Sequence, residues 1–201
     1  MKDRPILFSA PMVRAILAGR KTQTRRIVKP LHMATVDAEQ FPILAMCPYG
    51  SPGDRLWVRE TWQAIGGNER ARRILAKPDP SRGWIEYAAT VPKGHEPPPR
   101  WRPSIHMPRW ASRITLEITD VRVERLQDIS GEDAVAEGIA RDGDGYERFH
   151  VDPDAPLGQS FTRNPVLAYR GLWEKINGVG TWDANPLVWV IEFKRVEGGD
   201  A

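Results

Sequence analysis

The stretch "LAGRKTQTRRIVKP", residues 17–30, joins a helical pattern to an extended one. The apolar residues of "MVRAIL" just before it share one helical face, Ser9 suits the N-cap of that helix, and Gly19 can end it. After the turn, "TRRIV" predicts a strand. The stretch holds five Lys and Arg residues and two threonines. Three interpretations follow: a solvated basic turn, a phosphate-binding site or a reaction centre.

The composition is that of one globular domain with much loop. The chain has 201 residues, 18 prolines and 17 glycines, and its formal net charge is only +3. The mostly arginine cations permit a nucleic-acid or nucleotide partner without requiring one. Cys47 is the only cysteine, which excludes an intrachain disulfide. No apolar run approaches the ~20 residues of a membrane helix, and the N-terminus lacks a secretory pattern, so we expect a cytoplasmic protein.

Periodicity predicts several strands and few helices. We expect strands at residues 5–9, 53–62, 84–88, 113–126 and 186–196, and helices at residues 130–139 and 164–178. Ser130 and Asn164 suit the N-caps of the two later helices. Alternation in the strand at 113–126 slips near Thr119 and Asp120, which predicts a β-bulge.

Two segments, residues 63–112 and 141–163, look like excursions from a compact core. The first is rich in Pro, Gly and Arg, and the second in Asp, Gly and Pro. Spaced strands with few helices favour an α+β fold, a small mixed β-barrel with flanking helices, over βαβ winding. We therefore expect a single domain spanning residues 1–201 with two long insertions.

Lys21 and Thr24 are the first candidates for chemistry. A threonine hydroxyl is a poor nucleophile until a nearby base takes its proton. Lysine can be that base if burial or neighbouring cations depress its pKa, and Arg20, Arg25 and Arg26 could supply such cations. The alternative is a basic turn whose side chains are solvated.

Two glutamates raise a similar choice. Glu60 shares a strand face with Leu56 and Val58, so a barrel interior would have to provide it with a basic or hydrogen-bonding partner. The alternative is that the strand ends or bulges before Glu60. Glu137, near the end of the helix at 130–139, reads by itself as an ordinary exposed helical glutamate.

The segment "RWRPSIHMPRWASR", residues 100–113, mixes cations with flat rings. The cations are Arg100, Arg102, Arg109 and Arg113, and the rings are Trp101, His106 and Trp110. Arginines for phosphates and rings for base stacking are what a nucleic-acid surface uses. The alternative is that arginine stems pack over tryptophans at the edge of a core. The four histidines form no metal-binding pair and there is no phosphate-binding glycine loop, so we expect no metal and no cofactor.

Four stretches together resemble a known family. The pattern G-[RK]-K-T-x-T-x-R at residues 19–26 resembles the signature of ASCH domains, which belong to the PUA-like barrel superfamily. "PGDRLWVRETW" resembles the family's Gly-Asp turn and next strand, "ISGEDAVAEGI" its helix with a late glutamate, and "WVIEFKRV" its last strand. The whole is similar to the longer ASCH-like proteins encoded by phages and prophages.

The resemblance implies a PUA-like barrel that binds RNA or modified bases. Small bacterial ASCH proteins are amidohydrolases of N4-acylated cytidine, and another branch is a ribonuclease. Matching the motifs makes Thr24 the nucleophile, Lys21 its base, and Glu137 the residue that positions or polarises the substrate amide. The small amidohydrolases lack a segment like residues 63–112.

We therefore expect a domain that binds nucleic acid or a nucleoside, with N4-acylcytidine hydrolysis as its possible reaction. The residues expected to bind substrate or nucleic acid are Arg20, Arg25, Arg26, Glu60, Arg102, His106, Arg109 and Trp110. The alternatives are a nucleic-acid-binding module without catalysis, and a phage accessory or assembly protein that binds another protein through its tryptophan-rich insertion. Phosphate binding weakens steeply with salt, whereas an apolar protein contact does not. The sequence leaves the oligomeric state open.

Overall fold

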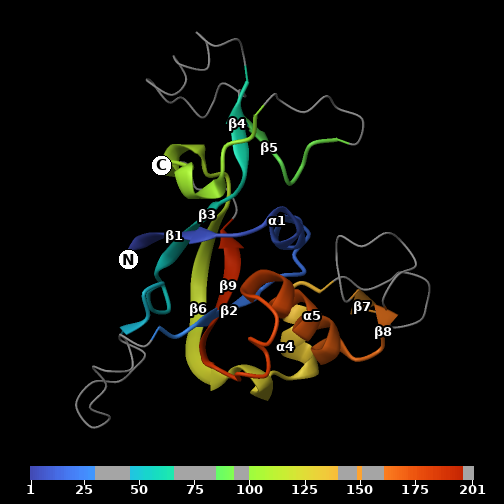
Figure 1. Cartoon of the computed structure of the whole chain (residues 1–201). Helices are drawn as coiled ribbons and strands as arrows, with labels where there is room; N and C mark the ends of the chain where they lie inside the picture. Colours follow the sequence, from blue (N-terminus) through green and yellow to red (C-terminus); the bar gives the residue numbers. More distant parts are fainter. Residues whose placement is uncertain (30–45, 66–84, 93–99, 140–148, 151–160, 197–201) are drawn as a thin grey trace.

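The fold is built on a five-stranded sheet. The computed structural model describes residues 1–29, 46–65, 85–92, 100–139, 149–150 and 161–196. In spatial order the strands are β1 (Asp3–Leu7), β3 (Arg55–Arg59), β6 (Thr115–Arg125), β9 (Leu187–Val196) and β2 (Gln23–Ile27) (Figure 1). Strands β1 and β3 are parallel, and the other neighbours are antiparallel. The expected α+β class is confirmed. Among the described residues the sheet stays open between β1 and β2, so closure into a barrel is not observed.

The long pair β6–β9 carries the predicted bulge. The register shifts between Ile118 and Asp120, which leaves Thr119 as the extra residue. Ile118 and Val121 are both buried in the same core, although they are three positions apart in the sequence. In a regular strand an odd separation would place them on opposite faces. The bulge therefore keeps Leu116, Ile118, Val121 and Val123 on one apolar face of β6.

Strand β9 is buried on both faces. Trp189, Ile191 and Phe193 point into one core, and Val188 and Val190 into another. Helix α1 (Ala10–Leu17) packs in the first core, whereas α4 (Gly131–Ala136) and α5 (Pro165–Asn177) pack in the second (Figure 1). This double burial explains why β9 reads as an almost continuous apolar run.

The helix caps follow the sequence with one exception. The Ser130 hydroxyl accepts a hydrogen bond from the Asp133 amide at 3.0 Å, and Asn164 caps α5 in the same way. Ser9 takes the N-cap position of α1, but its side chain makes no capping hydrogen bond. Pro11, the second residue of that helix, has no N–H to offer the hydroxyl. No helix in the described parts of the chain is long and apolar enough to cross a membrane.

The described residues of the segment 63–112 add a small layer at one end of the sheet. Strand β3 stops at Arg59, and β4 (Trp62–Ala64) pairs with β5 (Ile85–Tyr87). Two 3-10 turns, η3 (Ser104–His106) and η4 (Arg109–Ala111), cover this hairpin, and a third, η5 (Leu126–Asp128), precedes α4. The layer has its own apolar cluster, formed by Trp62, Ala64, Met107 and Ala111. In the second excursion, β7 (Phe149–His150) pairs with β8 (Phe161–Thr162).

The turn before β3 ties down the N-terminus. The Asp54 carboxylate accepts hydrogen bonds from the backbone amides of Lys2, at 2.7 Å, and Ser51, at 3.3 Å. These two bonds stabilise the ionised form, so they lower the pKa of Asp54 below its ordinary value. The resulting turn positions β3 beside β1.

Candidate active site

Lys21 lies in the protein interior, paired with Glu137. After α1 ends at Leu17, the chain turns at Gly19, which has φ +71°, and the Lys21 side chain is completely buried. Its Nζ donates hydrogen bonds to the Gln23 carbonyl at 2.8 Å, the Glu137 carbonyl at 2.9 Å and Glu137 Oε2 at 2.7 Å. All three ammonium hydrogens are therefore used. The pair joins residues that are 116 positions apart in the sequence.

Glu137 is not the exposed helical residue that its local pattern indicates. It is the C-cap of α4, and only 3% of its surface is exposed. Gly138 follows it with φ +93°, and a Cβ there would lie 2.9 Å from the Cβ atoms of Ala15 and Lys21. The missing side chain lets the end of α4 approach α1 closely, which carries Glu137 into the interior.

Arg25 holds the other side of the Glu137 carboxylate. Its Nη1 is 3.5 Å from Glu137 Oε1, and its Nη2 is 3.1 Å from Glu124 Oε2 and 3.0 Å from Asp133 Oδ2. Arg122 also pairs with Glu124 and Asp133, which extends the network to the surface. Arg25 is consequently engaged by carboxylates and does not offer its Nη atoms to a phosphate.

The surroundings shift the pKa values of two groups at the centre. Complete burial lowers the pKa of Lys21 below its ordinary value of 10.5, although Glu137 opposes the shift. Burial, and then the negative charge of Glu137, raise the pKa of Tyr169 well above its ordinary value. Tyr169 therefore keeps its proton, and a neutral Lys21 is easier to form here than in water.

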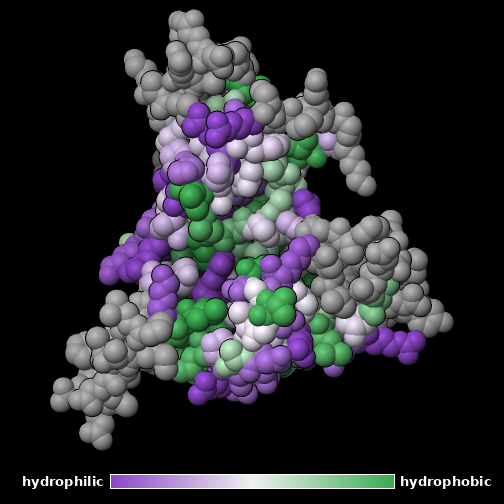
Figure 2. All heavy atoms as spheres, viewed as in Figure 1, coloured by the Kyte–Doolittle hydropathy of each residue, from purple (hydrophilic) through white to green (hydrophobic). Residues whose placement is uncertain are grey.

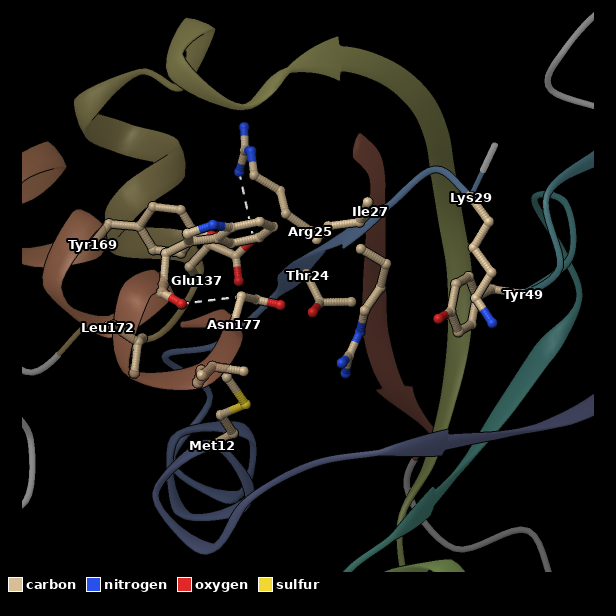
Figure 3. A pocket seen from close by; sticks show the side chains of 13 residues that line it. Met12, Thr24, Arg25, Ile27, Lys29, Tyr49, Glu137, Tyr169, Leu172 and Asn177 are labelled. Atoms are coloured by element: carbon tan, nitrogen blue, oxygen red, sulfur yellow. Dashed lines mark hydrogen bonds and ion pairs between the residues drawn. The ribbon is translucent and has the colours of Figure 1, made fainter. Parts of the chain in front are cut away.

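A cavity of about 220 Å³ opens beside Glu137. Strand β2 lies across its middle with Thr24 and Ile27, while Tyr49 and Lys29 lie on one side and Tyr169 and Leu172 on the other (Figure 3). The remaining lining residues are Met12, Arg25, Arg26, Trp173, Ile176 and Asn177. In the space-filling view, hydrophilic atoms lie at the bottom of a hollow with apolar rims on the face where α1, β2 and α5 meet (Figure 2).

The cavity offers hydrogen-bonding groups that are not used within the protein. Arg25 Nε and Trp173 Nε1, from two residues that line the cavity, have no hydrogen-bond partner among the described residues. Thr24 adds a hydroxyl to the same lining. Glu137 adds a carboxylate acceptor at the same wall. Lys21 does not line the cavity, so it can act on a ligand only through Glu137. A recess with polar groups and aromatic walls suits a flat, polar ring.

The two other arginines of the turn have different surroundings. Arg20 is exposed and donates to the Gly138 carbonyl at 3.2 Å, outside the cavity. Arg26 lines the cavity, lies 5.2 Å from the centre of the Phe8 ring and donates to the Leu7 carbonyl at 2.7 Å. Of the basic residues expected to bind substrate in this turn, the cavity thus includes Arg25 and Arg26 but not Arg20.

Glu60 has the predicted basic partner but belongs to another region. Strand β3 does end before it, and its side chain is nevertheless buried. Arg113 binds its carboxylate through Nε at 2.9 Å and Nη2 at 3.0 Å, and the guanidinium stacks 4.0 Å from the centre of the Tyr87 ring. Glu60 therefore helps to hold the layer of residues 63–112 and does not line the cavity.

The expected nucleic-acid surface at residues 100–113 divides into two parts. Arg102 and His106 line a second pocket near β4. Arg109 instead pairs with Asp3 at 3.2 Å, and Trp110 meets the Trp62 ring edge-on at 5.9 Å. For Arg109 and Trp110 the packing alternative fits the geometry better than the binding interpretation does.

Sequence reasoning missed the far wall of the cavity. Tyr169, Leu172, Trp173 and Ile176 form the apolar stripe of α5, but they also line the cavity. Ile176 is 49% exposed, so the apolar stripe of α5 extends beyond the residues that the core buries. No pattern in the sequence indicates Tyr49. Among the described residues, no group of three His, Cys, Asp or Glu side chains could hold a metal.

Comparison with known proteins identifies no relative: no family model, no curated protein and no solved structure matches this chain.

Proposed function

We propose that this protein is an ASCH-type domain with a PUA-like barrel architecture, and that its cavity binds a nucleobase or nucleoside, including a modified one. The observation that carries the proposal is the cavity itself, in which Thr24, Arg25 and Glu137 present polar atoms between aromatic walls. A nucleobase has the matching features: a flat apolar face and an edge that both donates and accepts hydrogen bonds.

The size of the cavity supports a ligand of this class. At about 220 Å³ it is smaller than the ~300–1,000 Å³ pockets that hold drug-sized molecules. It can enclose one base, while a sugar and its phosphates would remain outside. Lys29, which is exposed, and Arg26, which is half-buried, also line the cavity and provide cations for such a charged remainder.

The test is to fill the cavity and measure nucleoside binding. Leu172→Trp places an indole into the space, whereas Leu167→Trp puts the same group on the same helix at a residue that is 51% exposed and does not line the cavity. Isothermal titration with cytidine and N4-acetylcytidine should show at least about tenfold weaker binding for Leu172→Trp and unchanged binding for Leu167→Trp. Equal affinities in the two folded variants would exclude this cavity as the site.

Hydrolysis of N4-acylcytidine is the second candidate function. The observation in its favour is that Thr24 and Glu137 line one cavity, and that Lys21 contacts Glu137 at 2.7 Å. These are the three residues that the ASCH resemblance assigns to the reaction. A hydroxyl and a carboxylate that line the same cavity are an arrangement that can support nucleophilic attack.

In this reaction Thr24 Oγ1 attacks the amide carbonyl carbon and loses its proton to a neighbouring base. The C–N bond breaks, the cytosine amino group leaves with that proton, and water then hydrolyses the threonine ester to restore the hydroxyl. Lys21 has no lone pair while its ammonium donates three hydrogen bonds. We therefore assign the proton to Glu137, and Lys21 is a positioning residue that holds this carboxylate.

Release of cytidine from N4-acetylcytidine, measured by chromatography, tests the catalytic proposal. Thr24→Val keeps the shape and removes the hydroxyl, so it should abolish turnover and largely retain binding. Thr24→Ser, the matched control, keeps the hydroxyl and should retain measurable turnover. If the wild-type protein binds the nucleoside but releases no cytidine, the binding proposal stands and the catalytic proposal is excluded.

A further inference from the structure

A second pocket, of about 290 Å³, lies near β4 in the layer added by residues 63–112. Figure 1 shows β4 at the opposite end of the molecule from α4 and α5, so this pocket is separate from the cavity beside Glu137. Its lining residues are Gln63, Arg100, Trp101, Arg102, Pro103 and His106.

The pocket has a fixed floor. The Arg102 amide donates to the Trp62 carbonyl at 2.9 Å, and the Trp62 amide donates to the Arg102 carbonyl at 3.2 Å. Trp62 is 1% exposed, so this pairing ties the strip of chain around Arg102 to a buried anchor. Pro103 then leads into η3, which places His106 at the rim.

The charge of this pocket is one-sided. None of the described residues that line it is acidic, and no carboxylate in the described part of the chain pairs with Arg100 or Arg102. The neighbouring Arg109 and Arg113, by contrast, are each held by a carboxylate. Arg100 is exposed, and Arg102 lies over the Trp62 ring at 5.5 Å, which fixes its guanidinium without neutralising it.

We propose that this pocket binds the phosphodiester backbone of a single-stranded nucleic acid, with Arg100 and Arg102 contacting phosphates and Trp101 stacking on a base. Two guanidinium groups that no described carboxylate neutralises, beside a half-buried indole, combine the two contacts that such strands use. Gln63 Oε1, which has no partner among the described residues, gives a base amino group an acceptor. The proposal does not rest on the nucleoside cavity, because either site can be present without the other.

The salt dependence of binding tests the phosphate contacts. The probe is a labelled single-stranded RNA of about 12 nucleotides, followed by fluorescence anisotropy across a range of salt concentrations. Arg100→Ala with Arg102→Ala should reduce the slope of log affinity against log salt by about 1.4, since each single-strand phosphate contact contributes ~0.7. The matched control, Arg125→Ala with Arg163→Ala, removes the same charge from two exposed positions away from the pocket and should leave the slope unchanged.

Trp101→Ala tests the stacking contact. It should weaken RNA binding about tenfold and leave the salt slope unchanged, because the indole carries no charge. Thermal unfolding of each variant verifies that it is folded, and Arg102→Lys, which keeps the charge, should retain most of the slope. For single-stranded DNA of the same sequence, the double variant should show the same reduction in salt slope, because DNA has the same phosphates.

Two results would overturn the proposal. One is a slope that falls equally in the pocket variant and in the control, which would mean that general charge governs binding. The other is that inorganic pyrophosphate displaces the labelled RNA at the same concentration as unlabelled RNA does, which would identify a site for free phosphate. Nucleoside titration of the pocket variant separates the two sites, because binding in the cavity beside Glu137 should not change.

Discussion

The ion pair between Lys21 and Glu137 allows a sharp test of how the interior is held together. Glu137→Gln keeps the size of the side chain and removes its charge. Lys21 then remains completely buried, with the backbone carbonyls of Gln23 and residue 137 as acceptors but without the carboxylate at 2.7 Å. Arg25 loses its 3.5 Å contact with the same carboxylate, but it keeps Glu124 and Asp133 as partners.

The expected cost follows from this uncompensated charge. Removing one partner of a buried ion pair lowers the free energy of unfolding by about 3–5 kcal/mol. For a chain of 201 residues this corresponds to a melting temperature roughly 6–20 °C lower, at ~2–4 °C per kcal/mol. Lys21→Met should cost less, about 1–3 kcal/mol, because Glu137 keeps Arg25 as a second partner at 3.5 Å.

A double-mutant cycle measures the pair directly. Urea unfolding of the wild type, both single variants and the double variant, followed by tryptophan fluorescence, gives four free energies. The double variant leaves no buried charge of the pair, so its loss should be smaller than the sum of the single losses by about 2 kcal/mol. Additive losses, with Glu137→Gln costing under about 1 kcal/mol, would refute the buried charged pair.

The pH dependence provides an independent check with a defined sign. Burial lowers the pKa of Lys21 in the folded state, whereas the unfolded chain keeps a value near 10.5. Between these two values the unfolded state binds more protons, so this lysine makes stability rise with pH in that window. The stability of the wild type relative to Lys21→Met should therefore increase as the pH approaches 10.5, and a decrease would contradict the assigned direction.

Two further variants test the approach of α4 to α1 and the N-terminal turn. Gly138→Ala should lower the free energy of unfolding by more than the ~1–3 kcal/mol of backbone strain, because its Cβ would meet side chains at 2.9 Å. The control Gly180→Ala, at φ +83° with nothing within 4 Å, should cost only the backbone strain. Equal losses for the two variants in urea unfolding would contradict the close approach of α4 to α1. Asp54→Asn should destabilise the protein at neutral pH. In thermal unfolding, the difference in melting temperature from the wild type should vanish as the pH falls through the lowered pKa of Asp54, because the wild-type carboxylate is protonated there. A difference in melting temperature that persists in acid would contradict the role of the charge.

Local patterns in the sequence predicted those features that depend on neighbouring residues. The bulge at Thr119 follows from a slip in alternation within one strand, and the caps at Ser130 and Asn164 follow from side chains that reach only two or three residues ahead. The alternation of Leu56, Val58 and Glu60 left two interpretations open, and Glu60 is buried although β3 ends at Arg59. Such features need no knowledge of which elements pack together.

The spatial arrangement of the candidate site depended on contacts across the fold. The motif resemblance named Lys21, Thr24 and Glu137 together, but the burial of Glu137 follows from the packing of α4 against α1 beside Gly138. Tyr49 reaches the cavity from a segment without any motif.

The segment at residues 100–113 shows the same limit. Arg102 and Arg109 look alike in the sequence, yet Arg102 faces a pocket and Arg109 pairs with Asp3 on another strand. The sequence by itself determined the element types, the caps of α4 and α5 and the apolar faces, because these arise from periods and side-chain reach within a few residues. Only the tertiary structure decided which charged groups are paired and which remain available to a ligand, because a charge is neutralised by whatever group packing brings within a few ångströms of it.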